Sequence, residues 1–334
     1  MKKKITVLTL ALMLFAVSFH AEAQQAKKVP RIGYLSATSP SANLARIEAF
    51  RQGLRELGYV EGKNMVIEWR YAEEKLDHVR ELAAELVRLK VDVIVTAGPA
   101  STRLAKEATL TTPIVMAQVN DPVGNGFVAS LARPGGNITG LATLAPEISG
   151  KQLELLKEIV PRISRVAVVG NSTEPGNAQA LREVELAAGT FGVKLQHLDV
   201  LGPKDIETAF RAATKEHADA LLVLASPVLN DQRTHIADLA LKSRLPAIYP
   251  QTEYVEAGGL MYYGASTSDL FRRAATYVDK ILKGARPADL PVEQPKRFEF
   301  IINLKAAKQI GLTIPPNVLA RADKVIKESA GINR

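Results

Sequence analysis

VDVIVTAGPASTRLAKEATLTTPIVMAQV, residues 91–119, decides the fold because it holds a strand, a helix and a second strand in series. Val91–Ala97 is a short apolar run of the kind found in buried strands, and Ser101–Ala108 follows as a short helix. Ile114–Val119 is again short, apolar and rich in branched side chains. Two such strands joined by a helix predict a right-handed crossover and a parallel strand pair.

The same alternation extends in both directions from this unit. RIGYLS at Arg31–Ser36 opens one series of elements, and RVAVVG at Arg165–Gly170 opens a second series of similar size. The remaining expected strands are Met65–Tyr71, Lys194–Val200, Ala220–Ala225 and one beginning at Ala247–Tyr249. The expected helices include a stripe over Phe50–Leu57, another over Val79–Leu86, and Gly150–Val160, Ala178–Ala188, Asp205–Thr214 and Asp231–Ser243. The pattern predicts an α/β protein with two doubly wound parallel-sheet lobes.

The C-terminal part contains too few elements for a sheet of its own. A helix at Leu270–Leu282, a strand at Phe298–Ile302 and a last helix from Asn317 to Lys327 are expected there. We therefore expect these pieces to complete the two sheets, so that the chain crosses between lobes more than once. The expected N-terminal lobe is 30–144 plus 251–285, and the expected C-terminal lobe is 145–250 plus 286–334.

The N-terminus has the three parts of a secretory signal peptide. Lys2–Lys4 are basic, Ile5–Phe19 is apolar, and Ala21-Glu22-Ala23 offers small residues where a signal peptidase reads. We expect cleavage after Ala23 and a mature protein that is periplasmic and not membrane-anchored. An uncleaved membrane anchor is the alternative interpretation of the same segment.

Composition excludes several classes of protein. The chain has 334 residues and no cysteine, which removes disulfides, zinc–thiolate sites, iron–sulfur clusters and a lipid-anchoring cysteine. Its formal net charge of +8 is spread among Asp and Glu without a long basic run, so we expect no nucleic acid partner.

Motifs for catalysis and cofactor binding are missing from the sequence. It contains no phosphate-binding P-loop, no G-x-S-x-G nucleophile elbow and no H-E-x-x-H zinc motif. The histidines of the mature chain, His78, His197, His217 and His235, are far apart and look like surface residues. We expect no catalytic residue, no metal and no cofactor; a periplasmic enzyme is the disfavoured alternative.

Small hydroxyl and amide residues follow the expected strands, at the edge where open parallel sheets bind ligands. Ser36 and Thr38 follow the first strand, and Gly98, Pro99, Ala100 and Ser101 lie between the third strand and a helix. Such groups at a helix start suit a carboxylate or another small anion. They are also ordinary helix caps and turn residues, so each loop alone has a purely structural interpretation.

Three longer strings carry a family resemblance: TAGPASTRLAKEATLTTPIVMAQVNDPVGNGFVASLARPGGNITG (96–140), YVDKILKGARPADLPV (277–292) and FIINLKAAKQIGLTIPP (300–316). With them the chain resembles the periplasmic substrate-binding proteins of ABC transporters, in the family that includes tryptophan- and tyrosine-binding members. The resemblance implies a type I periplasmic binding protein fold, in which two lobes joined by a multi-segment hinge close on a small-molecule ligand. It also implies an inner-membrane ABC permease as partner.

By this resemblance, Gly98, Pro99, Ala100 and Ser101 should hold the ligand's polar end. Lining residues are further expected at Asn120 and Asp121 in the first lobe, at Asn171, Ser172 and Ser226 in the second, and at Tyr249 near a strand end. Aromatic side chains make up only 5% of the chain, so recognition of an aromatic ring stays open, as does an amino acid or another carboxylate as ligand. A ligand-sensing protein of a signalling system is the alternative function.

Overall fold

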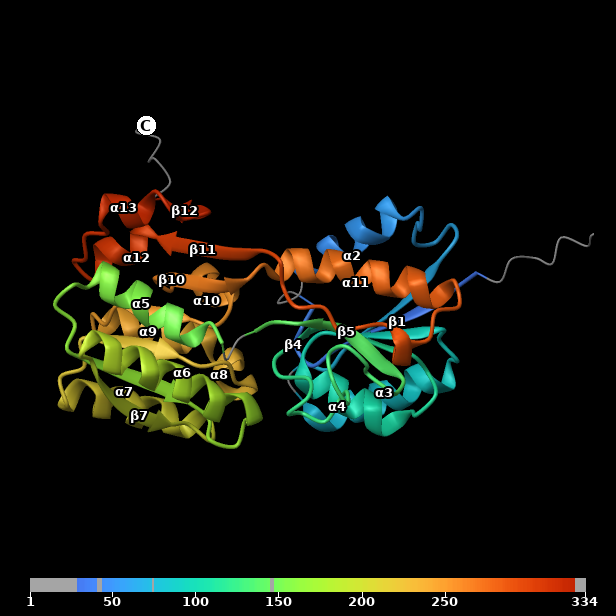
Figure 1. Cartoon of the computed structure of the whole chain (residues 1–334), viewed down its shortest axis with the longest axis horizontal. Helices are drawn as coiled ribbons and strands as arrows, with labels where there is room; N and C mark the ends of the chain where they lie inside the picture. The colour runs from blue at the N-terminus through green and yellow to red at the C-terminus, as the bar shows by residue number, and fades with distance from the viewer. Residues whose placement is uncertain (1–28, 41–43, 74, 145–146, 328–334) are drawn as a thin grey trace, which may run out of the picture.

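The computed structural model describes residues 29–40, 44–73, 75–144 and 147–327. They form two α/β lobes side by side, and the chain passes between the lobes more than once (Figure 1). The N-terminal residues 1–23, expected to be a signal peptide, lie outside the described residues. Every helix in the described ranges is too short or too polar to cross a membrane.

The first lobe is built on a five-stranded parallel sheet with the order β2-β1-β3-β4-β5. Its central strands are apolar on both faces, as expected for a parallel sheet covered by helices on each side. The strands are β1 (Arg31–Ser36), β2 (Val66–Tyr71), β3 (Val93–Thr96), β4 (Ile114–Val119) and β5 (Ile138–Ala142).

Helices cover both faces of this sheet. α2 (Leu44–Glu56) and α11 (Thr267–Leu282) pack against each other on one face, where Tyr34, Phe50 and Phe271 are fully buried. α3 (Leu76–Arg88) and α4 (Pro99–Ala108) cover the other face (Figure 1). The short η3 (Pro287–Asp289) also lies against β5.

The second lobe is built on a seven-stranded sheet with the order β12-β11-β10-β9-β8-β6-β7. All its neighbouring strands are parallel except β10 and β11, which run antiparallel. The strands are β6 (Arg165–Gly170), β7 (Lys194–Asp199), β8 (Ala220–Val223), β9 (Ala247–Tyr249), β10 (Met261–Ala265), β11 (Phe298–Asn303) and β12 (Lys324–Ile326).

This sheet too is covered on both faces. One core cluster lies under α5 (Ser149–Ile159) and α6 (Pro175–Phe191), and the other lies under α7 (Ile206–Lys215) and α9 (Arg233–Lys242). The shorter helices are η2 (Pro203–Asp205), α8 (Pro227–Asp231), α10 (Thr252–Glu256), α12 (Leu304–Gln309) and α13 (Pro316–Leu319).

The chain passes between the lobes after β5, after β10 and before β11. These passages are joined by backbone hydrogen bonds: Ser266 N donates to Arg297 O at 2.9 Å, and Ala142 N donates to Glu293 O at 2.9 Å. The lobe boundaries therefore differ from those expected. β10 lies in the second sheet because it pairs with β9 and β11, whereas Val292, in the segment after α11, is buried in the first-lobe core.

The expected C-terminal helix from Asn317 to Lys327 is wrong. Only α13 is helical, and the chain then adds β12 to the edge of the second sheet. Asp323 explains the change, because its backbone N–H donates to Phe300 O and its carboxylate accepts from Phe300 N, each at 2.8 Å. These two hydrogen bonds hold the chain alongside β11, where a strand can pair and a helix cannot.

Candidate functional site

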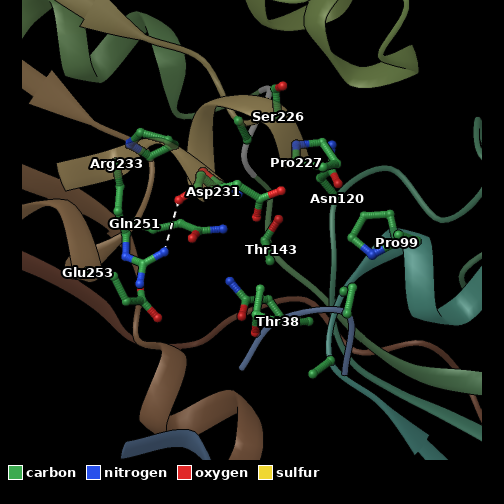
Figure 2. A pocket seen from close by; sticks show the side chains of 18 of the residues that line it. Thr38, Pro99, Asn120, Thr143, Ser226, Pro227, Asp231, Arg233, Gln251 and Glu253 are labelled. Atoms are coloured by element: carbon green, nitrogen blue, oxygen red, sulfur yellow. Dashed lines mark hydrogen bonds between the residues drawn. The ribbon is translucent and has the colours of Figure 1, made fainter. Parts of the chain in front are cut away.

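A cavity of about 250 Å³ lies between the lobes and is lined by residues of both. Figure 2 shows Pro99 on one side of it and Arg233, Gln251 and Glu253 on the other. The first-lobe wall comes from the carboxyl ends of β1, β3 and β4, and the second-lobe wall from the segments after β8 and β9. This is the edge where parallel sheets place ligands, because helix N-termini also point there.

The N-terminus of α4 forms the centre of the first-lobe wall. Gly98 precedes the helix with a φ of 119°, a conformation that favours glycine, and Pro99 occupies the first turn. The loop is held by Thr102, whose Oγ1 lies 2.6 Å from Thr96 Oγ1 and donates to Gly98 O at 2.9 Å. The first N–H groups of the helix have no carbonyl partner within it and face the cavity with the positive end of the helix dipole.

Ser101 adds a hydroxyl to this helix start. Its side chain is fully buried and lines the cavity, yet Oγ has no hydrogen-bond partner among the described residues. It is not a helix cap either, because Gly98 occupies the capping position. A buried hydroxyl without a partner is destabilising, so this atom is positioned to bond with something in the cavity.

The second-lobe wall starts at α8. Ser226 lines the cavity and caps this helix, its Oγ accepting from Leu229 N at 3.5 Å. Beyond α8 the side chain of Arg233 faces the cavity next to Gln251 (Figure 2). Its guanidinium donates to Asn230 O at 3.1 Å.

An ion pair joins the two lobes at the cavity. Arg46 of α2 contacts Glu253 of α10, and their side chains are only 10% and 14% exposed. The Arg46 guanidinium also lies 5.8 Å from the ring centre of Phe271, within the range of a cation–π contact. Thr252 Oγ1 donates to the second carboxylate oxygen of Glu253 at 3.2 Å.

A further carboxylate, Glu174, lines the cavity from the second lobe. Partial burial raises the pKa of Glu174, and the positive charge of Arg103 on α4 of the first lobe acts in the opposite direction. The cavity wall therefore carries charges of both signs, with the cations Arg46 and Arg233 and the anions Glu174, Asp231 and Glu253.

The structure brings seven of the residues expected from the sequence to the cavity wall. They are Thr38, Gly98, Pro99, Ala100, Ser101, Asn120 and Ser226. The remaining five do not line it. Ser36 is fully buried below Thr38, with which its hydroxyl shares a 3.1 Å hydrogen bond.

The other four have local partners or are buried in the core. Asp121 Oδ1 accepts from Gly124 N at 2.8 Å, and Asn171 Oδ1 accepts from the hydroxyl of Thr173 at 2.6 Å. Ser172 donates its hydroxyl to Asp199 at 2.7 Å. Tyr249 is fully buried and stacks on Tyr254 with ring centres 4.8 Å apart, and burial raises the pKa of its hydroxyl.

Sequence reasoning missed most of the charged wall. Arg46, Glu174, Asp231, Arg233 and Glu253 belong to helices or helix ends, where charged residues look like solvent-facing positions. One sequence feature points to Arg233: it begins a helix whose first turn has no acidic residue, although helix starts favour negative charge.

Comparison with known proteins identifies the family. The model of the family described as "ABC transporter substrate binding protein" matches residues 32–326. The chain is 25% identical over 287 residues to a tyrosine-binding protein of Clostridioides difficile (strain R20291), covering 86% of this chain and 82% of that relative.

Two solved structures share the fold over nearly the whole chain. One is a conserved domain protein from Vibrio cholerae, with 31% identity, a TM-score of 0.82, and 89% of this chain and 100% of that one covered. The other is an ABC domain in complex with L-Trp from Streptococcus pneumonia, with 29% identity, a TM-score of 0.78, and 88% and 100% covered.

The match spans both lobes and every element that lines the cavity. The fold is accordingly that of the type I periplasmic binding proteins. The chain belongs to the family of ABC transporter substrate-binding proteins.

Proposed function

We propose that the cavity binds an amino acid in the periplasm and that the closed complex is delivered to an inner-membrane ABC permease. The proposal concerns the ligand class, the location and the partner, since the solute-binding role itself follows from the family. The cavity has walls from both lobes, so a bound solute makes its full set of contacts only when the lobes are together.

The observation that carries the ligand class is the unpartnered Ser101 hydroxyl at the N-terminus of α4. A carboxylate accepts from this hydroxyl and from the first N–H groups of the helix, and its charge is stabilised by the helix dipole. The Glu174 and Asp231 carboxylates on the facing wall suit an ammonium group. A group that carries both charges close together is the head group of an amino acid.

The relatives support this class. One is a tyrosine-binding protein and another holds L-Trp, and these two ligands share the same head group. The periplasmic location rests on the sequence of residues 1–23, with a basic start, an apolar stretch and a small-residue cleavage site. N-terminal sequencing of protein from the soluble periplasmic fraction should begin at Gln24, whereas Met1 retained in the membrane pellet contradicts export and cleavage.

The ligand class is tested by mass spectrometry of whatever compound stays bound through purification. The compound is released by unfolding, identified, and titrated back into refolded protein in a calorimeter. An amino acid that rebinds with one site per chain supports the proposal. A sugar, a nucleoside or another compound without a carboxylate would overturn the amino-acid assignment while leaving the solute-binding role intact.

A further inference from the structure

Arg233 is the cation on the cavity wall that is not held in an ion pair among the described residues, although Asp231 lines the same wall. In the ranges that the structure describes it forms no ion pair, and the acceptor of its guanidinium is the single carbonyl of Asn230. A guanidinium has five N–H donors, so most of the Arg233 donors remain for a partner outside the described protein. The other cation of the wall, Arg46, is already paired with Glu253.

The position of Arg233 is unfavourable for the fold alone. It is the first residue of α9, whose first turn has no acidic residue, and a positive charge at a helix N-terminus opposes the helix dipole. Its side chain extends toward the cavity, next to Gln251 (Figure 2). A charge that is unfavourable in its helix and aimed into a binding cavity is explained by an anionic partner in that cavity.

The wall has little to offer an aromatic ring. Tyr262 is the one aromatic residue among the described lining residues, and its hydroxyl donates to Ala265 O at 2.6 Å while its ring is buried in the core. The apolar part of the wall consists instead of alanines, prolines, Ile148 and Val228. Stacking surfaces that a bound indole or phenol ring prefers are absent from the described lining.

We infer that Arg233 binds a second acidic group of the ligand, so that the ligand is an amino acid with a carboxylate side chain. This inference rests on the proposed function, because Ser101 and the start of α4 hold the carboxylate of the head group. Figure 2 places Pro99, the first residue of α4, and Arg233 on opposite sides of the cavity, as the two ends of such a ligand require. The two carboxylates and one ammonium group match Arg233, the α4 N-terminus and the acidic residues of the second lobe.

Calorimetry on the full mature protein, refolded free of any copurified compound, tests the inference. The probes are L-aspartate, L-glutamate, L-glutamine and L-tyrosine, and the variants are Arg233→Gln and Arg233→Lys. The acidic amino acid that binds more tightly should have an affinity roughly tenfold or more above that of L-glutamine, since a hydrogen bond between charged groups is worth that much. Arg233→Gln should weaken binding of the acidic amino acid far more than binding of L-glutamine and so remove this difference in affinity, whereas Arg233→Lys should keep part of it.

Arg211→Gln is the matched control, because Arg211 lies on the surface of α7 with 69% of its side chain exposed, and this variant should behave as wild type. Equal weakening of the acid and the amide in Arg233→Gln would show that Arg233 only supports the end of α8, and would overturn the inference. Tighter binding of L-tyrosine or L-glutamine, or no binding of either acidic amino acid, would overturn it too. The broader amino-acid assignment would then still be decided by the copurified compound.

Discussion

Arg46 and Glu253 lie 207 residues apart in the chain and form an ion pair that connects α2 of the first lobe with α10 of the second. The pair lines the cavity, so it lies where the lobes approach each other. Because both side chains are nearly buried, solvent screens their attraction far less than at the surface. The contact exists only when the lobes are together, and removal of either partner leaves the other charge nearly buried and unpaired.

Breaking this pair should destabilise the protein through the charge left behind. Arg46→Met leaves Glu253 nearly buried without its partner, which costs about 3 kcal/mol of the free energy of unfolding. The Arg46→Met/Glu253→Gln double variant should lose about 2 kcal/mol less than the sum of the two single variants, as measured by urea unfolding. Small-angle scattering of the single variants should also report a larger mean separation of the lobes.

The control for this cycle is the exposed pair Arg80–Glu107, whose side chains are 66% and 46% exposed. Its coupling energy should be at most about 1 kcal/mol. A coupling for Arg46 and Glu253 no larger than that of the control, together with unchanged scattering, would show that the interlobe pair does not hold the lobes.

Ser101→Ala should weaken ligand binding without lowering stability. The hydroxyl makes no hydrogen bond within the described protein, so its removal leaves no protein group unpaired, whereas a bound carboxylate loses a charge-assisted hydrogen bond. We expect roughly a ten- to hundredfold loss of affinity for the copurified compound by calorimetry, with a melting temperature of the ligand-free protein no lower than that of wild type.

Ser172→Ala is the matched comparison, since sequence patterns predicted both serines to bind ligand. Ser172 instead bonds Asp199 outside the cavity, so its variant should bind as wild type. Equal affinities of Ser101→Ala and wild type would remove Ser101 from the binding site.

The loop around Ser101 shows what a sequence can predict. Gly98 and Pro99 between a buried strand and a helix define a helix start at the binding edge of a parallel sheet, and these constraints are local. The direction in which a side chain points depends on the surrounding fold and not on the local sequence alone. Ser36 is the last residue of β1 and Thr38 follows two positions later, yet Ser36 is fully buried and only Thr38 lines the cavity.

Long-range pairing is the other part that the sequence did not reveal. In the sequence, Arg46 looks like one more charged residue on an amphipathic helix. Only the packing of the two lobes brings Glu253 beside it. In the same way, residues 317–327 have a helix-like pattern, but Asp323 pairs with Phe300 and turns the chain into an edge strand. Competition between local preference and a distant partner decides both cases.

Gly53→Ala tests the packing of α2 on α11. A methyl group at Gly53 would lie 2.3 Å from the backbone oxygen of Arg272, so the two helices have to move apart. We expect a loss of about 2 kcal/mol in the free energy of unfolding. Gly189→Ala, in α6 with open space around it, should instead stabilise by up to about 1 kcal/mol through helix propensity. Similar effects of the two substitutions would contradict the close helix contact.

Asp219 should contribute to the acid sensitivity of the second lobe. Partial burial raises the pKa of Asp219, but N–H groups of Ser164 and Arg165 at 2.7 and 2.9 Å, the Ser164 hydroxyl and the Arg165 charge together hold it below the ordinary value of 3.8. A carboxyl whose pKa is lowered by folding stabilises the folded state above its unfolded pKa, and this contribution is lost as the pH falls through the folded pKa.

The stability difference between wild type and Asp219→Asn should therefore be constant above about pH 5 and shrink below pH 3.8. Urea unfolding of both proteins across this range measures it. A difference that does not change with pH would mean that the charge of Asp219 has no part in holding the ends of β6 and β8 together.

The central claim is that an amino acid binds between the lobes at the N-terminus of α4. A crystal structure of the protein with its copurified compound tests this most directly. The account predicts an amino acid in the cavity, with its carboxylate within hydrogen-bond distance of Ser101 Oγ and with contacts to both lobes. A compound bound outside the cavity, or one in the cavity that leaves Ser101 and the start of α4 without contact, would contradict it.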